Sequence, residues 1–482
     1  MSTIVFSTSP LTLEERYGTL AGAGNTLPSM GLLYLSSVVR KNGYKTGVVE
    51  ASSLGLNYEE ALRQILSFSP DYVGITATTV SIFHAAKLAG KIKEKNKHIK
   101  VIIGGPHLTA VPKETMEMFP NFDYAVIGEG EETIVELLKY LDNGGNTDDV
   151  KGIAYRKKGQ GAGGKGQGNT TQINERRKLI DDLDTIPFPA WDILSDFPKG
   201  YHPVAIRCRK YPAAHLLTSR GCPHKCIFCD TSVFTKKYRA FSSEYILEMI
   251  KVLYNKYGIR EILFEDDVFV IFKKRLIEIC EGLLRENLKI SWSCLGRANA
   301  VKPDILKLMK KAGCWQIGFG IESGDQKVLD FAHKRITLEQ MEEAVRWTKE
   351  AGMETKGFFI LGFPLETDES IMNTINFSKR IMLDDISVNL MTPFPGSEIY
   401  NIADKYGKFN KDWSKMNMLQ SVFIPNGLSE DKLNFYNKKM LKEFYLRPRI
   451  IKNYALRMLE NPRNAGNFLK GLSAFLKTIA QR

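Results

Sequence analysis

Short apolar runs alternate with amphipathic segments along most of this chain, and this alternation constrains the fold more than any other feature of the sequence. In the first part, apolar runs of strand length lie at 4–7, 46–50, 72–76, 100–104 and 124–127. Helical patterns separate them at 30–41, 58–66, 81–95, 112–119 and 131–141. Strands that are apolar on both faces indicate a parallel sheet covered by helices on both sides. We therefore expect an α/β domain with a doubly wound five-stranded parallel sheet at residues 1–145.

The same alternation resumes after a linker, expected at 146–205. The glycine-rich stretch 157–169 is flexible by composition and is expected to tip a hairpin inside this linker. Six further β–α units have their strands at 215–218, 261–264, 290–293, 315–319, 355–361 and 386–391. They predict a partial (β/α)6 barrel at 206–400, with its chemistry at the carboxyl ends of the strands. Residues 401–482 are expected to form a small, basic helical region.

Three cysteines form a tight group directly after the first barrel strand. Cys222, Cys226 and Cys229 have the spacing C-x3-C-x2-C. Three thiolates at this spacing can bind three corners of a 4Fe–4S cluster. A structural zinc site needs a fourth Cys or His at a companion spacing, and His224 lies inside the loop without a second C-x2-C in the chain. The sequence therefore predicts an iron–sulfur cluster with one iron open to a further ligand.

The other cysteines and the termini indicate a reducing compartment. The chain has seven cysteines, none of them before Cys208 or after Cys314. This odd, clustered set argues against a disulfide framework. Cys280, Cys294 and Cys314 are expected to be buried apolar thiols, and Cys208 has no expected role. Because no apolar run reaches the roughly 18 residues of a membrane span and no signal-peptide pattern is present, we expect a cytoplasmic protein.

The formal net charge of +13 leaves several kinds of partner open. The simplest interpretation is a solvated surface, since net charge concerns partners rather than fold. The stretch 432–482 combines basic residues with aromatic ones, among them Lys438, Lys439, Arg447, Arg449, Lys452, Phe444, Tyr445 and Tyr454. Such a stretch also suits a membrane surface or a nucleic acid. We expect no nucleic-acid partner, and peripheral membrane association through this basic region stays open.

The cysteine segment resembles the radical S-adenosylmethionine superfamily, whose C-x3-C-x-aromatic-C signature is met by the three cysteines and Phe228. Later strand ends support this resemblance over the whole barrel, at 264–267, 318–324, 357–367 and 393–397. By resemblance, the open iron takes the amino and carboxylate groups of S-adenosylmethionine. Backbone near Phe228 and Ile360 would hold the adenine. Glu322 and Ser323 would face the ribose or the methionine part.

Two assignments near these strand ends stay open. Arg297 follows the third barrel strand and either pairs with a carboxylate of the cosubstrate or forms a structural ion pair. Glu265, Asp266 and Asp267 close the second strand, and they either serve the site or cap the next helix.

The first domain offers small and polar residues where a doubly wound sheet binds ligands, outside the carboxyl ends of its strands. After the third, fourth and fifth strands stand Thr76, Thr78, Gly104, Gly105, Gly128 and Glu129. Glycine permits close approach of the backbone, and hydroxyls suit a phosphate or a nucleotide loop. We predict that these six residues line a cofactor site.

Joined to the predicted barrel, this domain resembles the cobalamin-binding domain of cobalamin-dependent radical enzymes, and the resemblance covers nearly the whole chain. The familiar motif D-x-H-x-x-G supplies a histidine to cobalt, whereas Ser52 stands at that position in the stretch Glu-Ala-Ser-Ser-Leu-Gly at 50–55. The resemblance thus implies cobalamin bound without a histidine ligand, with its nucleotide tail beside the glycines after the fourth strand. We expect His107 to form a loop hydrogen bond and His84 to be an ordinary helix residue.

The resemblance implies a course for the reaction. An electron donor such as flavodoxin or ferredoxin reduces the cluster, S-adenosylmethionine breaks, and a 5′-deoxyadenosyl radical removes hydrogen from an unactivated carbon of a small-molecule substrate. The substrate radical then takes a methyl group from methylated cobalamin, which a second S-adenosylmethionine regenerates. The protein contributes positioning and the exclusion of water.

Other functions remain open at this stage. One is a cobalamin-dependent radical reaction without net methylation, resembling the anaerobic porphyrin-ester cyclases. A radical methylthiotransferase acting on transfer RNA is disfavoured because that family carries cysteines in its N-terminal domain, and none precedes Cys208 here. Members with auxiliary clusters would need cysteines after Cys314. A non-catalytic iron–sulfur module is disfavoured because the complete barrel pattern is retained.

Overall fold

The computed structural model describes residues 2–157, 170–204, 207–460, 466, 469, 471–474 and 476. The chain divides into two compact units, each made of three segments. Unit 1 contains Met1–Thr12, Pro28–Tyr201 and Asp230–Thr235. Unit 2 contains Leu13–Leu27, His202–Cys229 and Lys236–Arg482. The segments alternate along the chain, so neither unit is a continuous stretch of sequence.

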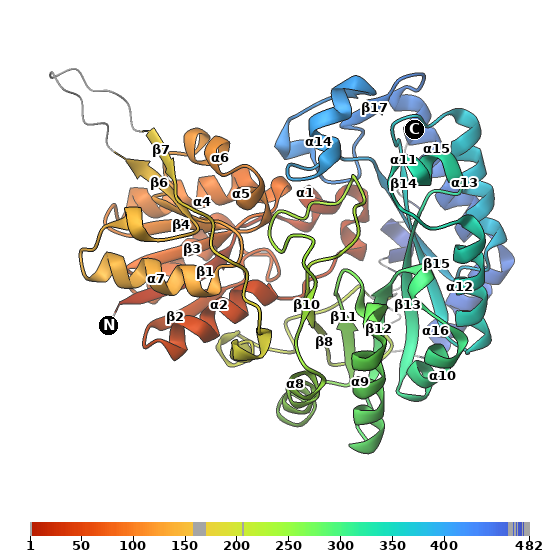
Figure 1. Ribbon diagram of the computed structural model, residues 1–482, viewed down its shortest axis with the longest axis horizontal. Helices are drawn as coiled ribbons and strands as arrows, with labels where there is room; N and C mark the ends of the chain where they lie inside the picture. The colour runs from red at the N-terminus through yellow and green to blue at the C-terminus, as the bar shows by residue number, and fades with distance from the viewer. Residues whose placement is uncertain are drawn as a thin grey trace. The chain divides into compact units, whose positions relative to one another are not determined.

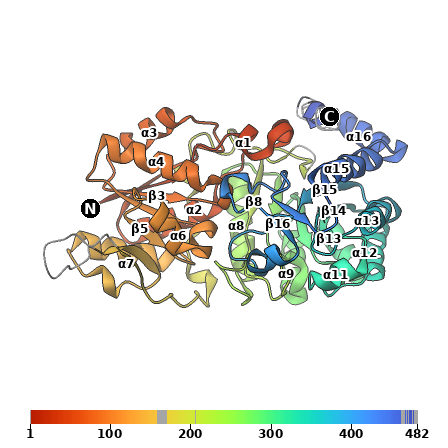
Figure 2. The ribbon, with the colours of Figure 1, turned by 90° about the horizontal axis from the view of Figure 1, so that it is seen from above.

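Unit 1 is built on one sheet with the strand order β2-β1-β3-β4-β5-β6-β7 (Figure 1). Its first five strands run parallel, as predicted: β1 (Thr3–Thr8), β2 (Lys45–Val49), β3 (Tyr72–Thr76), β4 (Lys100–Gly104) and β5 (Tyr124–Val126). The helices are α2 (Met30–Lys41), α3 (Tyr58–Ser67), α4 (Ile82–Lys95), α5 (Pro106–Ala110), α6 (Pro112–Met118) and α7 (Glu131–Asp142). Helices α3 and α4 pack together on one side of the sheet and α2 packs with α7, which lies on the other (Figure 2). This double cover explains why the strands are apolar on both faces.

The prediction of a five-stranded sheet is incomplete. Strand β6 (Ile153–Lys157) pairs antiparallel with β5 and with β7 (Thr170–Ile173). The apolar side chains of Ile153, Ala154 and Tyr155 are buried against the sheet, which explains why this hairpin joins it. The hairpin therefore belongs to the unit 1 sheet and not to a linker. Residues 158–169 of the glycine-rich stretch lie outside the described residues.

Unit 2 contains the predicted half-barrel, with the strand order β15-β14-β13-β12-β11-β8 and only parallel neighbours. The strands are β8 (Ala213–Leu216), β11 (Glu261–Phe264), β12 (Ser291–Gly296), β13 (Cys314–Glu322), β14 (Glu354–Leu361) and β15 (Asp385–Leu390). The helices along the barrel are α8 (Ser243–Lys256), α9 (Lys273–Arg285), α10 (Pro303–Lys311), α11 (Gln326–Phe331), α12 (Leu338–Glu350) and α13 (Asp368–Arg380). Local signals set their starts: the Thr337 and Gln340 side chains form a capping box at α12.

Further helices and short paired strands complete unit 2. They are α1 (Leu13–Tyr17), β9 (Ser219–Arg220), β10 (Arg239–Ala240), α14 (Glu398–Ile402), β16 (Gly407–Phe409), β17 (Phe423–Pro425), α15 (Glu430–Tyr445) and α16 (Pro448–Glu460). The part after the barrel is therefore not only helical, because β16 and β17 pair antiparallel. Helix α15 packs against β15.

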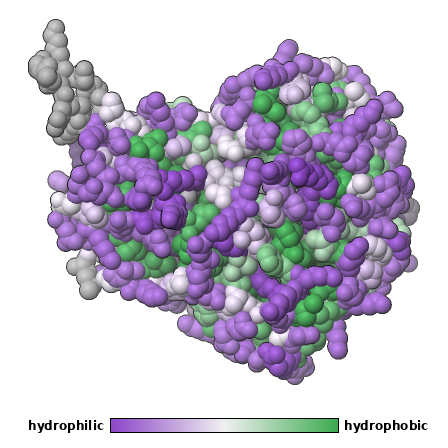
Figure 3. Space-filling model, in the orientation of Figure 1, coloured by the Kyte–Doolittle hydropathy of each residue, from purple (hydrophilic) through white to green (hydrophobic). Residues whose placement is uncertain are grey.

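Two arginines of the basic C-terminal stretch bind carboxylates of unit 2 itself. Arg449 lies 3.4 Å from Asp384, and Arg457 forms an ion pair with Glu354. Both carboxylates lie at the amino ends of barrel strands, where α15 and α16 are attached. The charge seen in the sequence is thus partly neutralised within the fold. Polar residues cover most of the face that Figure 3 shows. Among the described residues, no helix is long and apolar enough to cross a membrane.

Candidate active site

The three predicted cluster ligands belong to unit 2 and lie on one loop, whose segment Asp230–Thr235 belongs to unit 1. We call residues 221–238, which connect β9 and β10, the cluster loop. Cys222 and Cys226 are half-buried and Cys229 is exposed. The Cys229 backbone N–H donates to the Cys226 carbonyl at 3.2 Å, and the two thiols are within hydrogen-bonding reach of each other. The backbone bond therefore holds Cys226 and Cys229 on one turn of the loop.

Cationic side chains surround these thiols. A guanidinium N–H of Arg297 points at the Cys226 sulfur from 3.9 Å, and Arg297 also donates to the Lys334 carbonyl. The hydrogen bond from Cys229, with the charges of Lys334 and Arg297, lowers the pKa of the Cys226 thiol. Burial and the same cations lower the pKa of His224 to about 4, so its imidazole is neutral at pH 7. A thiolate-rich anionic group would be stabilised at this position.

The donor set fits a cluster better than a single metal ion. Among the residues that the structure describes, no three His, Cys, Asp or Glu side chains converge closely enough to share one metal ion. A cubane cluster does not require such convergence, because each thiolate binds a different iron. Three thiols on one loop, with cations behind them, fit a 4Fe–4S group. The assignment of Cys222, Cys226 and Cys229 as its ligands stays a prediction.

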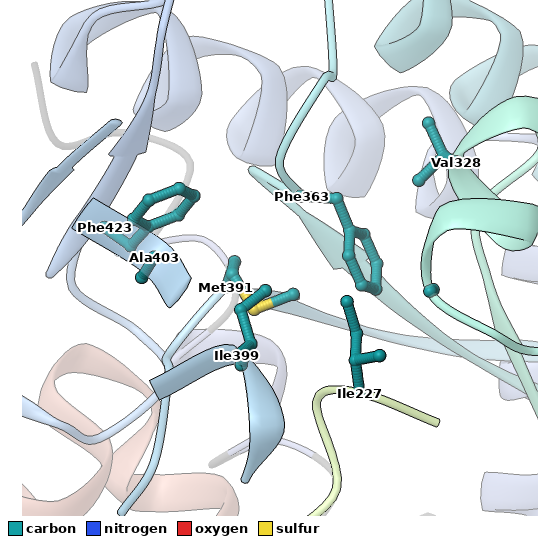
Figure 4. Packing of buried hydrophobic residues seen from close by; sticks show 8 residues of the cluster. Ile227, Val328, Phe363, Met391, Ile399, Ala403 and Phe423 are labelled. Atoms are coloured by element: carbon teal, nitrogen blue, oxygen red, sulfur yellow. The ribbon is translucent and has the colours of Figure 1, made fainter. Parts of the chain in front are cut away.

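The middle of the cluster loop is anchored in an apolar cluster. Ile227 donates its N–H to the Ala332 carbonyl at 3.2 Å and accepts from the Ile399 N–H at 3.0 Å. Its side chain packs near Phe363 and Met391 (Figure 4). The neighbouring cluster members are Val328, Ala332, Ile399, Ala403 and Phe423.

Phe228 and Ile360 lie against this same apolar cluster, half-buried. The Phe228 ring meets the Phe363 ring edge to face, with centroids 5.6 Å apart. The structure therefore brings together the two residues predicted to lie near the adenine, although they are 132 positions apart in the sequence. Flat apolar surface of this kind suits a purine ring.

Glu322 ends β13 in a buried ion pair. Its Oε1 lies 2.7 Å from Nζ of Lys334, and both side chains are almost fully buried. Glu322 has φ of 64°, a left-handed conformation that costs energy for a non-glycine residue, at a β-bulge against β14. A Cβ on Gly320 would collide with the Glu322 carboxylate and lie 2.8 Å from the Lys334 nitrogen. Glycine at 320 thus leaves the space that the ion pair occupies.

Ser323 is bonded to a neighbouring helix, and Lys334 is a residue that the sequence analysis did not single out. The Ser323 hydroxyl is buried and lies 3.0 Å from the Thr374 hydroxyl, so it holds the end of β13 against α13. Lys334 carries the cation paired with Glu322, its charge also lowers the pKa of the Cys226 thiol, and nothing in the local sequence singles it out. It follows α11 by three residues, in a turn whose position depends on the tertiary fold.

The three acids after β11 do not cap α9, whose N-cap residue is Phe272. Asp266 is fully buried and accepts the Thr218 N–H at 2.9 Å, the Thr218 hydroxyl and the Ser219 hydroxyl. Glu265 pairs with Arg207 at 2.9 Å. Burial raises the pKa of Asp267. The capping alternative is therefore wrong for all three residues.

The remaining cysteines lie apart from the cluster loop's ligand positions. Cys280, Cys294 and Cys314 are buried, as expected, and Cys208 is buried as well. The Cys208 thiol donates to the Lys210 carbonyl at 3.0 Å.

In unit 1, the predicted residues after β3 and β4 meet at one point of the sheet edge. Thr76 and Gly104 are register partners at the ends of these strands. Gly105 has φ of 101°, and a Cβ there would lie 2.7 Å from both the Ala77 carbonyl and the Thr76 hydroxyl. Only glycine permits the two loops to approach this closely. Thr78 begins the next loop, with its N–H bonded to the Ser81 hydroxyl at 2.9 Å.

The residues after β5 are tied to the same edge through Thr109, which the sequence did not indicate. The Thr109 hydroxyl donates to the Gly105 carbonyl at 2.9 Å and accepts from the Gly128 N–H at 3.1 Å. Glu129 is buried and accepts the Ile180 N–H at 2.8 Å, so its carboxylate holds the following segment of unit 1. Gly104, Gly105 and Gly128 therefore form one narrow glycine-lined edge.

Two imidazoles of unit 1, those of His84 and His107, contact protein hydroxyls. His107 is buried, its Nδ1 lies 3.3 Å from the Thr79 hydroxyl, and burial lowers its pKa to about 4. The His84 Nδ1 lies 2.8 Å from the Tyr58 hydroxyl. At the position where the familiar motif has histidine, the Ser52 hydroxyl donates to the Leu11 carbonyl at 3.0 Å. The absence of a histidine ligand to cobalt stays a prediction.

Comparison with known proteins agrees with this pair of sites. Residues 216–378 match the radical SAM superfamily, and residues 18–138 match the B12 binding domain. An uncharacterised methyltransferase of Pyrococcus horikoshii is 35% identical over 89% of this chain and 90% of its own length. The anaerobic magnesium-protoporphyrin IX monomethyl ester cyclase of Rubrivivax gelatinosus is 29% identical over 95% of this chain and 80% of its own length.

A solved structure shows the same fold over nearly the whole chain. The cobalamin-dependent S-adenosylmethionine radical enzyme OxsB, with aqua-cobalamin and S-adenosylmethionine bound, superposes with a TM-score of 0.73. The match covers 97% of this chain and 72% of that one at 20% identity. The chain therefore belongs to the cobalamin-dependent radical S-adenosylmethionine enzymes of methyltransferase type, and its cofactors are a 4Fe–4S cluster, S-adenosylmethionine and cobalamin.

Proposed function

We propose that this protein methylates an unactivated carbon of a small-molecule substrate. The observation that carries the proposal is the combination, in one chain, of a thiol loop backed by cations and a separate glycine-lined sheet edge. The 35% identity to a methyltransferase over most of both chains supports it. When bound, the cluster supplies the electron that cleaves S-adenosylmethionine, and cobalamin carries the methyl group.

The residues around the cluster loop have different roles in binding the cluster and S-adenosylmethionine. Cys222, Cys226 and Cys229 serve as the cluster ligands. Arg297 stabilises the Cys226 thiolate through its N–H···S contact of 3.9 Å. Lys334 is the buried cation best placed to bind the carboxylate of S-adenosylmethionine, which would compete with Glu322 for its ammonium group.

Phe228 and Ile360 would hold the adenine against the apolar cluster that anchors the loop. Once Lys334 binds the carboxylate of S-adenosylmethionine, the Glu322 oxygen that it had contacted would accept a hydrogen bond from a ribose hydroxyl. Ser323 contributes by fixing the end of β13 through Thr374. These assignments explain why a strained backbone is retained at Glu322.

In unit 1, we assign Gly104, Gly105 and Gly128 to the nucleotide tail of cobalamin. Each exposes backbone without a side chain, and Thr109 holds two of these loops together. Thr76 and Thr78 supply hydroxyls beside them. Glu129 supports the site indirectly through Ile180. Because Ser52 stands at the histidine position of the familiar motif and its hydroxyl bonds the Leu11 carbonyl, the cobalt would have no imidazole ligand from that position.

One face of the barrel sheet suits a small substrate with both apolar and polar parts. The register places partly accessible side chains on the same face along four of the strands: His215, Leu295, Phe358, Ser387 and Asn389. Side chains on the opposite face are buried beneath the helices. A neutral imidazole, an amide and a hydroxyl among apolar groups would orient an uncharged substrate by hydrogen bonds. Burial lowers the pKa of His215 to about 4, which keeps it neutral.

A second candidate is a radical cyclisation without net methylation. The observation that favours it is the 29% identity to an anaerobic porphyrin-ester cyclase over 95% of this chain. The two functions differ in their use of S-adenosylmethionine. A methyltransferase also consumes it as a methyl donor and releases S-adenosylhomocysteine, whereas a cyclase releases only 5′-deoxyadenosine and methionine.

This difference gives a test that needs no substrate. Protein loaded anaerobically with iron, sulfide and cobalamin is incubated with S-adenosylmethionine and dithionite, and both nucleoside products are measured. We expect 5′-deoxyadenosine and S-adenosylhomocysteine together. The variant Cys226→Ala/Cys229→Ala should bind cobalamin but form no 5′-deoxyadenosine. 5′-Deoxyadenosine without S-adenosylhomocysteine would favour the cyclisation, and neither product from fully loaded protein would contradict a radical enzyme.

For partners, we propose a small electron-transfer protein such as flavodoxin or ferredoxin as the reductant. Peripheral membrane contact stays a proposal with a narrower basis than the sequence suggested, because Arg449 and Arg457 bind carboxylates within unit 2. Its support is the exposed apolar side chains of α16, namely Ile451, Leu456 and Leu459. Sedimentation with anionic phosphatidylglycerol vesicles would test it, and loss of binding in Leu459→Asp would support this helix as the contact.

A further inference from the structure

The base of the cluster loop is closed by a short two-stranded ladder. Ser219 pairs with Ala240 and Arg220 with Arg239. The Phe241 N–H donates to the Thr218 carbonyl at 3.1 Å, which continues the closure by one step. The chain therefore enters the cluster loop, towards Cys222, through Thr218 and Ser219.

Two buried charged residues hold this entry point from different elements. Asp266, after β11, accepts from the Thr218 N–H at 2.9 Å, from the Thr218 hydroxyl at 2.9 and 3.1 Å and from the Ser219 hydroxyl. Arg275, in α9, donates to the Thr218 carbonyl at 2.9 Å and to the Thr218 hydroxyl. Arg275 also donates to the Tyr238 hydroxyl at 3.1 Å, at the far end of the loop. Thr218 is thus fixed through its N–H, its carbonyl and its hydroxyl at once.

The two ends of the cysteine motif have separate anchors. Cys226 and Cys229 flank Ile227, which is held by the Ala332 and Ile399 backbones and by the apolar cluster. Cys222 lies four residues from Thr218 and is on the side of the loop that the two charged residues hold. The distance between Cys222 and the other two thiols therefore depends on how firmly the entry is fixed.

We propose that Asp266 and Arg275 form an ionic brace that positions Cys222 as a cluster ligand. This inference rests on the proposed ligation by the three cysteines and adds two positioning residues that bind neither cluster nor cosubstrate. Charge-assisted hydrogen bonds in a buried site are strong and directional, so the brace fixes the backbone more firmly than apolar packing would. Weakening it lets Cys222 drift and makes its iron easier to lose.

The test is the rate of iron release from reconstituted holoenzyme to a ferrous chelator, measured anaerobically. Supporting residues of metal sites change affinity by tenfold or more when altered. We expect Asp266→Asn to release iron about tenfold faster than the unaltered protein. Thr218→Val removes only the hydroxyl shared by the two charges and keeps the side-chain shape, so it should release iron faster by a smaller factor. It also serves if Asp266→Asn fails to fold.

The matched control is Asp385→Asn. Asp385 is also a fully buried carboxylate of unit 2, bonded to Lys356 at 2.8 Å and to the Tyr445 hydroxyl at 2.6 Å. It starts β15, at the opposite end of the parallel sheet from Asp266. Its loss should lower the unfolding temperature without changing the rate of iron release.

The outcomes separate this inference from the function it rests on. Iron release from Asp266→Asn and Thr218→Val that matches the Asp385→Asn rate would overturn the brace, because the effect would then be general destabilisation. Unaltered protein that takes up no iron on reconstitution would instead overturn the ligation by the three cysteines. A distinct electron paramagnetic resonance signal of the reduced cluster in the two brace variants would be a second mark of a displaced ligand.

Discussion

Among single residues, Lys334 has the most neighbours of functional interest, since it pairs with Glu322 and lies near Cys226 and the Phe228 ring. A buried ion pair is a poor source of stability, because the cost of desolvating both charges offsets most of their attraction. Its retention next to a thiol loop therefore agrees better with binding an anion than with holding the fold. Gly320, which leaves room for the ion pair, is consistent with the same interpretation.

Replacing Lys334 by Met should affect both stability and cosubstrate binding. The change leaves the Glu322 carboxylate buried without its cation, which costs about 3 kcal/mol. Lys356→Met is the matched control, because it breaks an equally buried pair with Asp385 at the other end of the sheet. Calorimetric titration of both variants with S-adenosylmethionine should show weaker binding only for Lys334→Met. Equal affinities would remove Lys334 from the cosubstrate site.

Glu366 gives a pH dependence that can be assigned to one group. It is fully buried and accepts from the Gly362 and Phe363 N–H groups at 2.5 and 3.1 Å. Burial, against these two hydrogen bonds, raises the pKa of Glu366 from 4.5 to about 8. Because the folded pKa is raised, its stabilising contribution is complete below about pH 4.5 and is lost as the pH rises through 8.

Glu366→Gln should abolish this part of the pH dependence. Glutamine cannot ionise, so the free energy of unfolding of the unaltered protein should fall relative to the variant between pH 4.5 and 9. A rise of the pKa from 4.5 to about 8 corresponds to a total change of at most about 5 kcal/mol. Urea unfolding at several pH values measures it. A difference between the two proteins that stays constant with pH would show that Glu366 titrates normally.

At the scale of elements, the hydrophobic periodicity of the sequence predicted helices and strands well wherever strands and helices alternate regularly. Strands such as β3 and β11 and helix α2 have the predicted bounds, because the change from an apolar run to an amphipathic pattern marks where each element ends. The antiparallel β6 and β7 were missed as members of the sheet, since their short, mixed pattern does not reveal which edge they extend. β9 and β10 have two residues each and carry no periodic signal.

The candidate site likewise has residues that the sequence predicted and residues that it did not. The cysteine spacing and the glycines after the strands are local features, so the sequence alone located the loops that carry them. Lys334, Asp266, Arg275 and Thr109 act through contacts between distant segments, and neither spacing nor composition reveals such contacts. The basic character of α16 was visible in the sequence. Which of its cations face the barrel was not, because the ion pairs with Asp384 and Glu354 form only in the folded chain.

The attachment of α16 can be tested by neutralising one side of the helix. Arg457→Gln removes a cation that is half-buried against Glu354, while Lys452 is exposed. We expect Arg457→Gln to lower the free energy of unfolding by about 2 kcal/mol, as for other hydrogen bonds to charged groups. Lys452→Gln should change it by less than about 0.5 kcal/mol. Equal effects in chemical denaturation would show that α16 is not held by this ion pair.

At the scale of the whole molecule, we propose that the two compact units serve different cofactors. Binding to one unit stabilises only the state in which that unit is folded. Hydroxocobalamin at about 100 times its dissociation constant should therefore add about 2.7 kcal/mol to the unfolding of unit 1. Differential scanning calorimetry of the apoprotein should show one transition moving upwards with added cobalamin. A uniform shift of all transitions would indicate that the units unfold together.

The alternation of segments between the units also bears on inheritance and design. The chain passes alternately through three segments of each unit, so it crosses between the units at five points. A single recombination event can never exchange one unit cleanly for a homologue, since it would always divide the other. A chimaera with a foreign corrinoid module would have to keep Leu13–Leu27 native and replace Asp230–Thr235 as well, directly next to Cys229. Exchange of either unit therefore needs several chain junctions at once.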